Sequence, residues 1–433
     1  LEGAGFIRRL GANDPSPRYL SDAFIIPKPH STTGEVRFVC NYAKMKHIFK
    51  RDPVKQKDPF SIVAGLKDGC KNFFTADMSS GYFQLKLEDS PEGSGITAFM
   101  CELGIFEWLV VPMGMQPSSD GLSRQMMEVF KELFAPETKG GAAAGASMVR
   151  DLDDFLGGGR TKKEFYEVIE AFLKRCHERG IYLNPSKFQV ALEEEAEEGE
   201  PHGVLFAGIL VKSDGTFEMD PRRLDAIRKY PLPKTRKELE SWVGLCTSLN
   251  QFAPKPLHGV MPLQRALLYS SYRQPLNWDN WQAAKKEFYE CRRQCSDATQ
   301  ILHAFDPELV TAIMTDVAKT TGLGIFLFQH DAKLPLEETN PKTGRVNFKL
   351  MGIWSVAAKP SWRNLSALET EIVGYIQATI KLHYYISGAP VIYGYVDHKP
   401  FQQIYMGKEM QDLTPRSLKL LQDLLEYLSL IHI

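Results

Sequence analysis

The sequence predicts an α+β protein with several domains, and three observations lead to this prediction. Its 433 residues are enough for about two to four domains of ordinary size. Apolar residues make up 43% of the chain and charged residues 24%, which excludes a disordered, collagen-like or disulfide-scaffold protein. The last third of the chain has the predicted order strand, strand, strand, helix, strand, which is typical of a compact mixed α/β domain.

The N-terminal part of the chain predicts extended segments. Residues 21–42 predict a β-hairpin, because DAFIIPKP and EVRFVCNY are extended and the HSTTG between them favours a turn, with Arg37 near the tip. Residues 73–88 begin as a strand, break at the Ser-Ser-Gly of residues 79–81, and resume. The segment GIFEWLVVPMGM is again extended, and a helix is expected after it.

A tight hairpin with an acidic turn is predicted after a low-complexity loop. The KGGAAAGAS within residues 137–149 indicates a flexible loop. In MVRDLDDFLGGG, two short apolar arms flank the acidic residues, and three glycines end the hairpin. From Thr161, which can cap a helix, apolar residues recur at helical spacing and predict an amphipathic helix that packs on a sheet. These apolar residues are Phe165, Val168, Ile169, Phe172, Leu173 and Cys176.

The second half of the chain predicts a strand pair, a run of helices and then the mixed domain. Residues 204–219 form the strand pair, and KTRKELESWVGLCTSL begins a helical stretch that extends, with breaks at prolines, to about residue 300. Residues 309–330 predict two strands around a glycine-containing turn. A third strand at MGIWSV, a helix at ALETEIVGYIQATIKLHYYI and a last strand at VIYGYVDH follow.

Charge and cysteine usage limit the class of protein. The net charge is −1, but residues 1–60 hold eleven Lys or Arg against six Asp or Glu, and residues 222–240 hold seven against three. The acidic run EEEAEEGE at residues 193–200 is interpreted as a solvated loop that does not cancel these basic regions. Seven cysteines without a paired framework favour a reducing compartment. The chain has no apolar run of the ~20 residues that a membrane helix needs and no signal-peptide layout, so we expect a soluble intracellular protein.

Acidic residues at the ends of apolar strands form a first candidate metal site. Asp77 and the pair Asp153 and Asp154 are costly to bury unless something neutralises them. Two or three convergent carboxylates are the usual protein share of a magnesium site, and two ions about 4 Å apart can stabilise phosphoryl transfer. Adjacent strand residues face opposite sides, so both members of the pair cannot point at Asp77 unless the turn breaks the alternation, and Asp153 is favoured. Spacing alone also allows a turn cap at Asp77 and a solvated DLDD loop.

Three acids in the C-terminal part suggest a second metal site. Asp316 ends the strand AIMTD, Glu371 lies on the predicted helix, and Asp397 ends the last strand. Glu369 precedes Glu371 by two residues, so only one of the two faces a given side of a helix.

The segments FFTADMSSGYFQLKL, GIFEWLVVPMGM, LDDFL, GIYLNPSKF, FAGILVKSDG and KTRKELESWVGL resemble the reverse transcriptase of gypsy-type long-terminal-repeat retrotransposons and their retroviral relatives. The blocks follow family order from Gly5 to the C-terminus. The resemblance implies a right-hand polymerase followed by an RNase H-like mixed α/β domain. It places fingers and palm at 1–205, thumb and connecting helices at 206–304, and an RNase H-like domain, truncated at its C-terminal end, at 305–433.

The resemblance also implies roles for individual residues of the polymerase. Asp77, Asp153 and Asp154 match its catalytic aspartates, and Met78 joins them as a metal-binding residue. Ser80 and Gly81 match positions whose backbone amides approach the triphosphate. Tyr82 matches the aromatic residue under the sugar that rejects ribonucleotides, and Arg37 matches a fingers arginine that binds the triphosphate. Lys187 matches a lysine proposed to protonate pyrophosphate. Core packing for Tyr82 and simple solvation for Arg37 remain alternatives.

In the C-terminal part, TDV, LETEIVGY and VDHKP match the blocks of the family's ribonuclease H domain. The resemblance therefore implies that Asp316, Glu371 and Asp397 are catalytic and metal-binding, with Glu371 and not Glu369 as the catalytic glutamate. The family's fourth aspartate would lie beyond the last residue. We expect an excised fragment of a longer polyprotein with reduced RNase H activity.

The function expected from the resemblance is an RNA- and DNA-templated DNA polymerase with RNase H activity on RNA–DNA hybrids, dependent on Mg²⁺ or, alternatively, Mn²⁺. Its expected partners are a primed RNA or DNA template, the hybrid and deoxynucleoside triphosphates, with no membrane, in a monomer or dimer located in the cytoplasm within virus-like particles. Basic residues of the predicted thumb should follow the duplex backbone. They are Arg222, Arg223, Arg228, Lys229, Lys234, Arg236 and Lys237.

Several departures from the family pattern keep a second hypothesis open. Asp151 stands where the family has an aromatic residue, MQPSSDGLSRQMM replaces the usual small-residue and proline run, and Asn41 replaces an aspartate. The KGGAAAGAS loop lengthens the connection to the hairpin. The alternative is a catalytically weakened or domesticated module that binds nucleic acid, and primer extension with magnesium distinguishes it from an enzyme.

Overall fold

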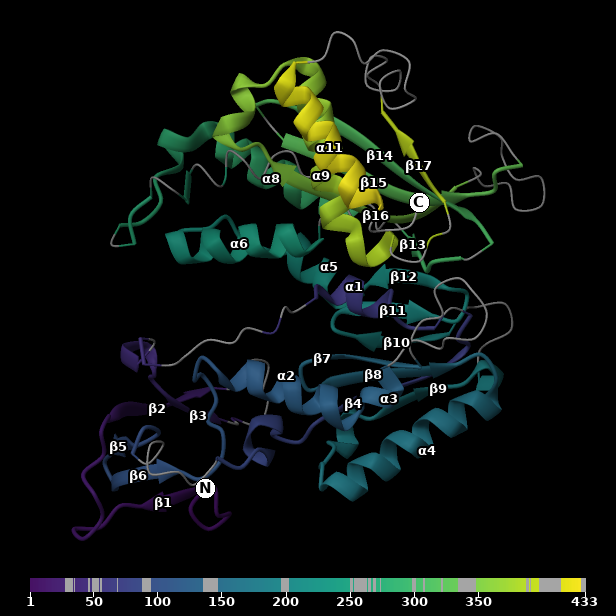
Figure 1. Cartoon of the computed structure of the whole chain (residues 1–433). Helices are drawn as coiled ribbons and strands as arrows, with labels where there is room; N and C mark the ends of the chain where they lie inside the picture. The colour runs from purple at the N-terminus through teal and green to yellow at the C-terminus, as the bar shows by residue number, and fades with distance from the viewer. Residues whose placement is uncertain are drawn as a thin grey trace. The chain divides into compact units, whose positions relative to one another are not determined.

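In a computed structural model, the protein folds into two units, each with its own sheets (Figure 1). The first unit comprises Leu1–Ile62, Asn72–Ala135 and Ala146–Ala191, and the second comprises Val63–Lys71, Pro136–Gly145 and Leu192–Ile433. The structure describes residues 1–27, 34, 36–45, 47–48, 54, 57–67, 69–87, 95–134, 147–195, 202–249, 252, 263, 266–267, 270–272, 274–297, 301–306, 308–320, 322–333, 348–386, 389, 391–396 and 414–429.

The first unit contains a five-stranded sheet with the order β1-β6-β5-β2-β3. Its strands are β1 (Ile7–Arg9), β2 (Ser21–Pro27), β3 (Val36–Cys40), β5 (Phe99–Cys101) and β6 (Gly104–Trp108). The antiparallel pairing of β2 with β3 confirms the predicted hairpin, whose HSTTG turn lies mostly outside the described residues.

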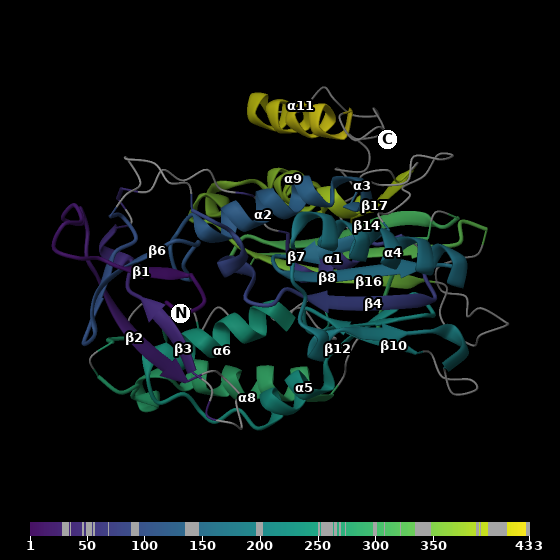
Figure 2. The same cartoon turned by 90° about the horizontal axis from the view of Figure 1, so that it is seen from below.

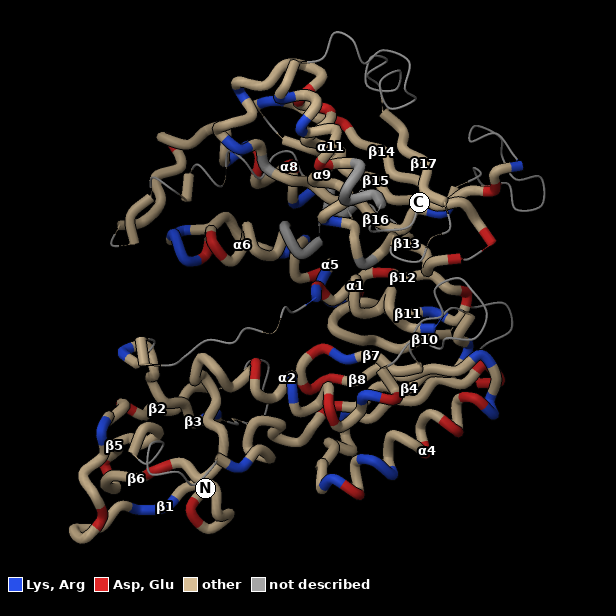
Figure 3. The backbone as a smooth tube through the Cα atoms, in the orientation of Figure 1, with Lys and Arg blue, Asp and Glu red and all other residues tan. Residues whose placement is uncertain are grey.

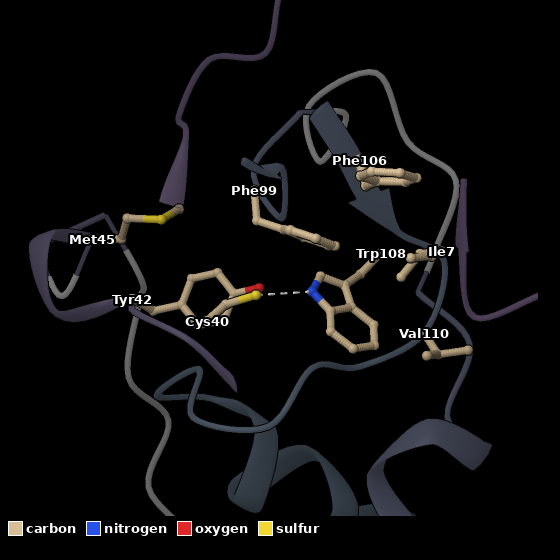
Figure 4. Packing of buried hydrophobic residues seen from close by; sticks show 8 residues of the cluster. All are labelled: Ile7, Cys40, Tyr42, Met45, Phe99, Phe106, Trp108 and Val110. Atoms are coloured by element: carbon tan, nitrogen blue, oxygen red, sulfur yellow. Dashed lines mark hydrogen bonds between the residues drawn. The ribbon is translucent and has the colours of Figure 1, made fainter. Parts of the chain in front are cut away.

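A cluster of buried side chains forms the core of this sheet, as Figure 4 shows. Its members are Ile7, Cys40, Tyr42, Met45, Phe99, Phe106, Trp108 and Val110. The Trp108 indole N–H donates a hydrogen bond to the Cys40 sulfur at 3.4 Å, and the Trp108 ring centroid lies 5.7 Å from that of Phe99. Burying several large aromatic side chains together stabilises a sheet strongly, so this sheet is a firm base for the loops attached to it.

The second sheet of this unit has the order β7-β8-β4-β9. Its strands are β4 (Asn72–Asp77), β7 (Met148–Asp151), β8 (Asp154–Gly159) and β9 (Gln189–Ala191). The helix α4 (Lys162–Arg179) packs against β8 and β4 with Phe165, Phe172 and Cys176 buried, as the periodicity predicts, whereas Leu173, predicted on the same face, is exposed (Figures 1 and 2). The Thr161 side chain accepts a hydrogen bond from the Glu164 amide and caps the helix, as expected.

The three glycines that the sequence predicts at the end of the acidic hairpin are the last three residues of β8. A Cβ atom at Gly157 would come within 2.3 Å of the Phe74 ring, and one at Gly159 within 2.4 Å of the Phe165 backbone nitrogen. These glycines are therefore required by close packing on β4 and α4, because no side chain fits between the elements.

Shorter elements complete the first unit. They are the 3-10 turns η1 (Ala43–Met45), η2 (Gly81–Gln84) and η3 (Pro185–Lys187) and the helices α2 (Ser118–Val129) and α3 (Lys131–Phe134). The short helix α1 (Pro59–Val63) has residues in both units. The start of α2 confirms the helix predicted after GIFEWLVVPMGM. The predicted KGGAAAGAS loop lies outside the described residues, apart from Ser147.

The second unit begins with the antiparallel sheet β10-β11-β12-β13, whose strands are β10 (Gly203–Phe206), β11 (Ile209–Lys212), β12 (Thr216–Met219) and β13 (Leu302–His303). The helices α5 (Pro221–Arg228), α6 (Arg236–Leu249) and α8 (Gln282–Asp297) follow, and both α5 and α6 pack against α8. The buried rings of Trp242 and Phe288 are in contact between α6 and α8. Two 3-10 turns, η4 (Glu193–Glu195) and η6 (Trp278–Trp281), belong to the same unit. The predicted helical stretch between residues 234 and 300 is thus confirmed where the structure describes it.

The rest of the second unit has the predicted order of elements. The sheet β16-β15-β14-β17 consists of β14 (Val310–Ala318), β15 (Gly322–His330), β16 (Lys349–Ala357) and β17 (Ile392–Tyr395). The first three strands are antiparallel to one another, and β17 lies parallel to β14. The helix α9 (Ala367–Ile386) packs on β14, η7 (Pro360–Asn364) precedes it, and α11 (Pro415–Ser429) packs on α9.

Two further expectations can be compared with the described residues. Among them, no helix is long and apolar enough to cross a membrane. Six of the cysteine side chains are described, and none of these six is in a disulfide bond. The domain boundaries expected after residues 205 and 304 stay predictions.

Candidate active site

The strand register aligns three aspartates in one row across the sheet of the first unit. Asp154, at the start of β8, is opposite Asp77 on β4 and opposite Asp151 on β7. Directly opposite residues of antiparallel strands project from the same face, with Cα atoms about 4.5–5.5 Å apart. Asp77, Asp151 and Asp154 therefore present their carboxyl groups on one face, at the end of the hairpin.

Asp153 reaches the same group from the turn. Leu152 and Asp153 connect β7 to β8, and Leu152 has a φ of 54°, so the turn breaks the alternation of strand side chains. The Asp153 carbonyl accepts a hydrogen bond from the Met78 amide at 3.1 Å, just beyond the end of β4. The sequence favoured Asp153 over Asp154, whereas in the structure Asp154 is the residue opposite Asp77 and Asp153 joins them.

Burial and mutual repulsion raise the pKa values of these acids. The pKa of Asp154 rises to about 7 because the carboxyl is desolvated, shares a hydrogen bond with Asp77 and lies near the charges of Asp153 and Asp77. Burial, and then the Asp77 and Asp151 charges, raise the pKa of Asp153. Burial also raises the pKa of Asp151, against the opposing effect of Arg150. Such a group is stabilised in its ionised form by a nearby cation.

Lys187 supplies one cation to the group. Its ammonium lies 2.9 Å from an Asp77 carboxylate oxygen, with the lysine side chain 61% exposed and that of Asp77 15% exposed. The hydrogen bond to Asp77 raises the pKa of Lys187. Asn184 caps the turn η3, which carries Lys187, and its side chain accepts a hydrogen bond from the Ser186 amide. The Asn184 backbone amide donates a hydrogen bond to the Asp77 carbonyl at 2.8 Å. Lys187 is thus held beside Asp77 by the backbone of β4.

The loop after β4 brings the predicted nucleotide-binding residues to the same place. Ser80 adopts left-handed backbone angles, with φ 53° and ψ 50°, and leads into η2. A Cβ atom at Gly81 would lie 3.2 Å from the Asp153 Cβ, so glycine lets this loop lie against the hairpin turn. Tyr82 is half-buried, and its burial followed by the Asp153 charge raises its pKa. The Phe83 ring packs 5.1 Å from Trp108, which anchors the loop on the core shown in Figure 4.

Gln84 helps to hold the two segments of the site together, and the sequence interpretation missed it. Its side-chain amide donates hydrogen bonds to the Ser79 carbonyl at 2.6 Å and to the Tyr182 carbonyl at 2.8 Å. Its carbonyl oxygen accepts a hydrogen bond from the Tyr182 amide at 2.9 Å. One side chain therefore ties the loop after Asp77 to the segment that leads to Lys187. The only sequence signal was a polar residue between apolar ones in GYFQLKL.

Arg37 is placed apart from this group. It lies exposed on β3, opposite Ile26, in the five-stranded sheet, whereas the carboxylates belong to the other sheet. Its predicted role toward a triphosphate stays a prediction.

The donor set of the carboxylate group fits a hard divalent cation. Its candidate ligands are carboxylate oxygens, which suit magnesium or manganese and not soft-ligand zinc chemistry. The Met78 side chain is buried, so Met78 has only its backbone carbonyl to offer. Across the described residues, no three Asp, Glu, His or Cys side chains are arranged to hold an ion. The donor chemistry of the site therefore fits the metal.

The acids predicted for the second metal site are only partly described. Asp316 is exposed on β14, Glu371 is 9% exposed on α9, and Asp397 lies outside the described residues. Glu369 has a local role: its carboxylate accepts a hydrogen bond from the Ser366 amide at 2.8 Å, and the Ser366 hydroxyl accepts one from the Glu369 amide at 3.1 Å. This reciprocal pair is a capping box at the start of α9, which leaves Glu371 as the candidate on that helix.

The basic residues predicted for the thumb lie on α5, on α6 and between them, where Figure 3 shows basic segments. Three of them form ion pairs within their own elements: Arg222 with Asp220, Arg228 with Asp225 and Arg236 with Glu240. The Arg222 and Arg228 side chains are 78% and 52% exposed in these pairs, so they stay accessible to other anions. Contact with a duplex stays a prediction.

The sheet β7-β8-β4-β9, with aspartates on β4 and at a hairpin turn and with α4 packed on it, lies where the resemblance predicts the palm of a right-hand polymerase. Residues 26–216 match the family model described as "Reverse transcriptase (RNA-dependent DNA polymerase)". The chain therefore contains a reverse transcriptase domain, and it has homologues among retrotransposon and viral polyproteins.

Three curated relatives illustrate this similarity. The chain is 23% identical over 409 residues to the "Retrovirus-related Pol polyprotein from transposon 297" of Drosophila melanogaster, covering 94% of this chain and 34% of the relative. It is 25% identical over 251 residues to the "Enzymatic polyprotein" of Cauliflower mosaic virus (strain D/H), covering 58% and 34%. It is 22% identical over 328 residues to the "Transposon Tf2-3 polyprotein" of Schizosaccharomyces pombe, covering 76% and 22%. The chain thus spans about a fifth to a third of these relatives.

Solved structures confirm the right-hand polymerase part of the predicted fold. The structure described as "Structure of the foamy viral protease-reverse transcriptase dRH in complex with ds DNA" superposes with a TM-score of 0.70 at 18% identity, over 98% of this chain and 66% of that chain. A foamy viral protease-reverse transcriptase in complex with RNA/DNA hybrid gives a TM-score of 0.69 at 17% identity, over 97% and 50%. At these identities the likeness shows the fold alone.

Proposed function

We propose that this chain is the polymerase part of a gypsy-type long-terminal-repeat retrotransposon polyprotein and that it copies RNA and DNA templates into DNA. The observation that carries the proposal is the strand register that brings Asp77 opposite Asp154, with Asp153 beside them in the hairpin turn. The proposed substrates are a primed template and deoxynucleoside triphosphates, and the proposed location is the cytoplasm, within virus-like particles.

The reaction joins the primer 3′-oxygen to the α-phosphorus of the nucleotide and breaks the bond to pyrophosphate. A divalent cation held by Asp77, Asp153 and Asp154, magnesium or alternatively manganese, would supply charge stabilisation for the attacking and leaving oxygens. Ser80 and Gly81 would offer backbone amides to the triphosphate, and Arg37 would pair with its charge. Tyr82 would support the sugar from below.

Lys187 would donate the proton that the leaving pyrophosphate needs. Its ammonium is already at the site, 2.9 Å from Asp77, and the raised pKa keeps its proton on Nζ at neutral pH. A positioned acid near a leaving oxygen contributes to catalysis by proton transfer in the transition state.

A second activity, RNase H cleavage of the RNA strand of a hybrid, is proposed for the C-terminal part of the chain. Three antiparallel strands, a helix on β14 and a fourth strand parallel to β14 support it. Asp316, Glu371 and Asp397 would hold the cation for this activity.

The competing function is a weakened polymerase that only binds nucleic acid. It is favoured by the additional carboxylate at Asp151 and by the MQPSSDGLS segment, which departs from the family pattern. Like charges opposite each other on neighbouring strands are destabilising, so Asp151 adds a cost to the group.

Primer extension separates these functions. The protein is incubated with a radiolabelled DNA primer on an RNA and on a DNA template, with each deoxynucleotide and Mg²⁺ or Mn²⁺, and in parallel with Asp153→Asn. An enzyme extends the primer on both templates, and the variant, which still binds the primed template in a gel-shift assay, does not. Tight binding without extension by the unmodified protein would establish the binding module instead.

A further inference from the structure

The turn that carries Asp153 has an unfavourable backbone at Leu152. The φ of Leu152 is 54°, in the left-handed region where the Cβ of an L-residue crowds the following carbonyl. Glycine, asparagine or aspartate is the usual choice there, and leucine is not. A turn of this kind persists only when its surroundings hold it, and such strain is concentrated at functional sites.

Arg150 is hydrogen-bonded to this turn. Its guanidinium donates one hydrogen bond to the Leu152 carbonyl at 3.2 Å and another to the Ser123 carbonyl at 2.7 Å. Ser123 is buried on α2, and the guanidinium also lies over the Phe134 ring of α3, 5.7 Å from its centroid. The side chain therefore connects the carbonyl of the strained residue to two helices that pack beside the hairpin.

An arginine is suited to this connection. Its planar guanidinium has five donors in a fixed fork, so one group can bond two carbonyls in different directions while its face stacks on an aromatic ring. A lysine at this position has a single nitrogen on a flexible chain and cannot hold both carbonyls in the same way. Arg150 is opposite Phe155 in the register, so its side chain is on the other face of the sheet from Asp154.

We propose that Arg150 is a positioning residue, which holds the Leu152 turn and thereby keeps Asp153 and Asp154 directed toward Asp77. It does not touch the reacting atoms; it acts through the turn. This inference rests on the proposed polymerase function for its catalytic consequence, and on the contacts of Arg150 alone for its effect on the turn.

The test combines Arg150→Met with Leu152→Gly. Arg150→Met keeps most of the side-chain volume and removes every donor, so the turn can relax to negative φ and displace Asp153. We expect kcat for nucleotide addition to fall about 10- to 100-fold with the nucleotide KM within about twofold, because misplacement of a catalytic group of the order of 1 Å costs that much. Glycine adopts positive φ without cost, so adding Leu152→Gly should restore most of the lost kcat.

Two control variants show whether the loss of kcat comes from the turn. Arg175→Met removes an arginine of the same unit that also donates to a helix carbonyl, that of Val129 at 2.9 Å, away from the hairpin, and it should leave kcat unchanged. Asp151→Asn in the Arg150→Met background tests whether Arg150 only balances the neighbouring charge. Rescue by Asp151→Asn and not by Leu152→Gly would overturn the proposal, as would an Arg150→Met variant with the kcat of the unmodified protein.

Hydrogen–deuterium exchange gives a readout that does not need activity. Exchange in the 148–159 segment should increase in Arg150→Met and decrease again in the double variant with Leu152→Gly, while Arg175→Met leaves it unchanged. If the unmodified protein does not extend primers, the proposed function fails, and this exchange pattern still decides the role of Arg150. If Arg150→Met does not fold, Arg150→Lys is measured in its place, and unaltered exchange in that variant overturns the proposal.

Discussion

Replacing Asp154 by asparagine removes the carboxyl whose pKa is raised to about 7, and with it the proton that a divalent cation must displace. A metal ligand has to be deprotonated, so protons compete with the metal at this site. The sign follows from the direction of the shift: because the pKa is above its ordinary value of 3.8, the acid is mostly protonated below pH 7 and ionised above it.

The size of the effect follows from the same pKa. One proton bound with a pKa of about 7 weakens the apparent affinity for the metal about tenfold at pH 6 relative to pH 8, where the site is almost fully ionised. In Asp154→Asn the affinity at pH 8 should be lower, because a ligand is lost, and the tenfold change between pH 6 and pH 8 should largely disappear.

The assay is binding of Mn²⁺ to the protein without nucleic acid, followed by the electron paramagnetic resonance signal of free Mn²⁺ at constant ionic strength from pH 6 to pH 8.5. Asp14→Asn is the control, because Asp14 is a carboxyl of the same unit that pairs with Arg8 outside the site. Equal affinity at pH 6 and pH 8 in the unmodified protein, or the same tenfold change in Asp154→Asn, would refute the assignment of this proton to Asp154.

Three further outcomes are expected. Gly157→Ala should lower the free energy of unfolding in urea by about 1–3 kcal/mol, because its Cβ would lie 2.3 Å from a buried ring, while Gly121→Ala, with open space around it, should not destabilise the protein. Gln84→Leu removes three hydrogen bonds, two of which join the loop after β4 to the segment that leads to Lys187, so kcat for primer extension should fall while the melting temperature changes by only a few degrees; an unchanged kcat would contradict its positioning role. Ser366→Ala removes the cap that accepts from the Glu369 amide and should cost about 1 kcal/mol in thermal unfolding, and no loss of stability would show that the capping box contributes nothing.

Much of the fold could be predicted from local sequence patterns. The helix at 162–179 and the order of elements after residue 309 follow from periodicities that each segment carries within itself. The sequence placed three glycines at the end of the hairpin, but the packing reason for two of them, Gly157 and Gly159, is not local. They leave room for Phe74 and for the backbone of α4, and both come from other parts of the chain.

The candidate site was predictable as a set of residues and not as an arrangement. Asp77, Asp153 and Asp154 stand out because acids at the ends of apolar strands need neutralisation. Which aspartate is opposite Asp77 depends on strand register, which tertiary packing sets. Gln84 and Arg150 were missed because the partners that matter here are backbone amides and carbonyls, which no sequence pattern marks.

The sequence by itself marked acids at the ends of apolar strands that suit a hard cation, and its resemblance to reverse transcriptases implied a lysine beside them and a polymerase palm. The tertiary structure decided how those groups meet, with Asp154 in a row with Asp77 and Asp151, and Asp153 placed by a strained turn that Arg150 contacts. The physical reason is that residue type sets charge and hydrogen-bonding capacity locally, whereas register, burial and backbone strain arise only when distant segments pack together.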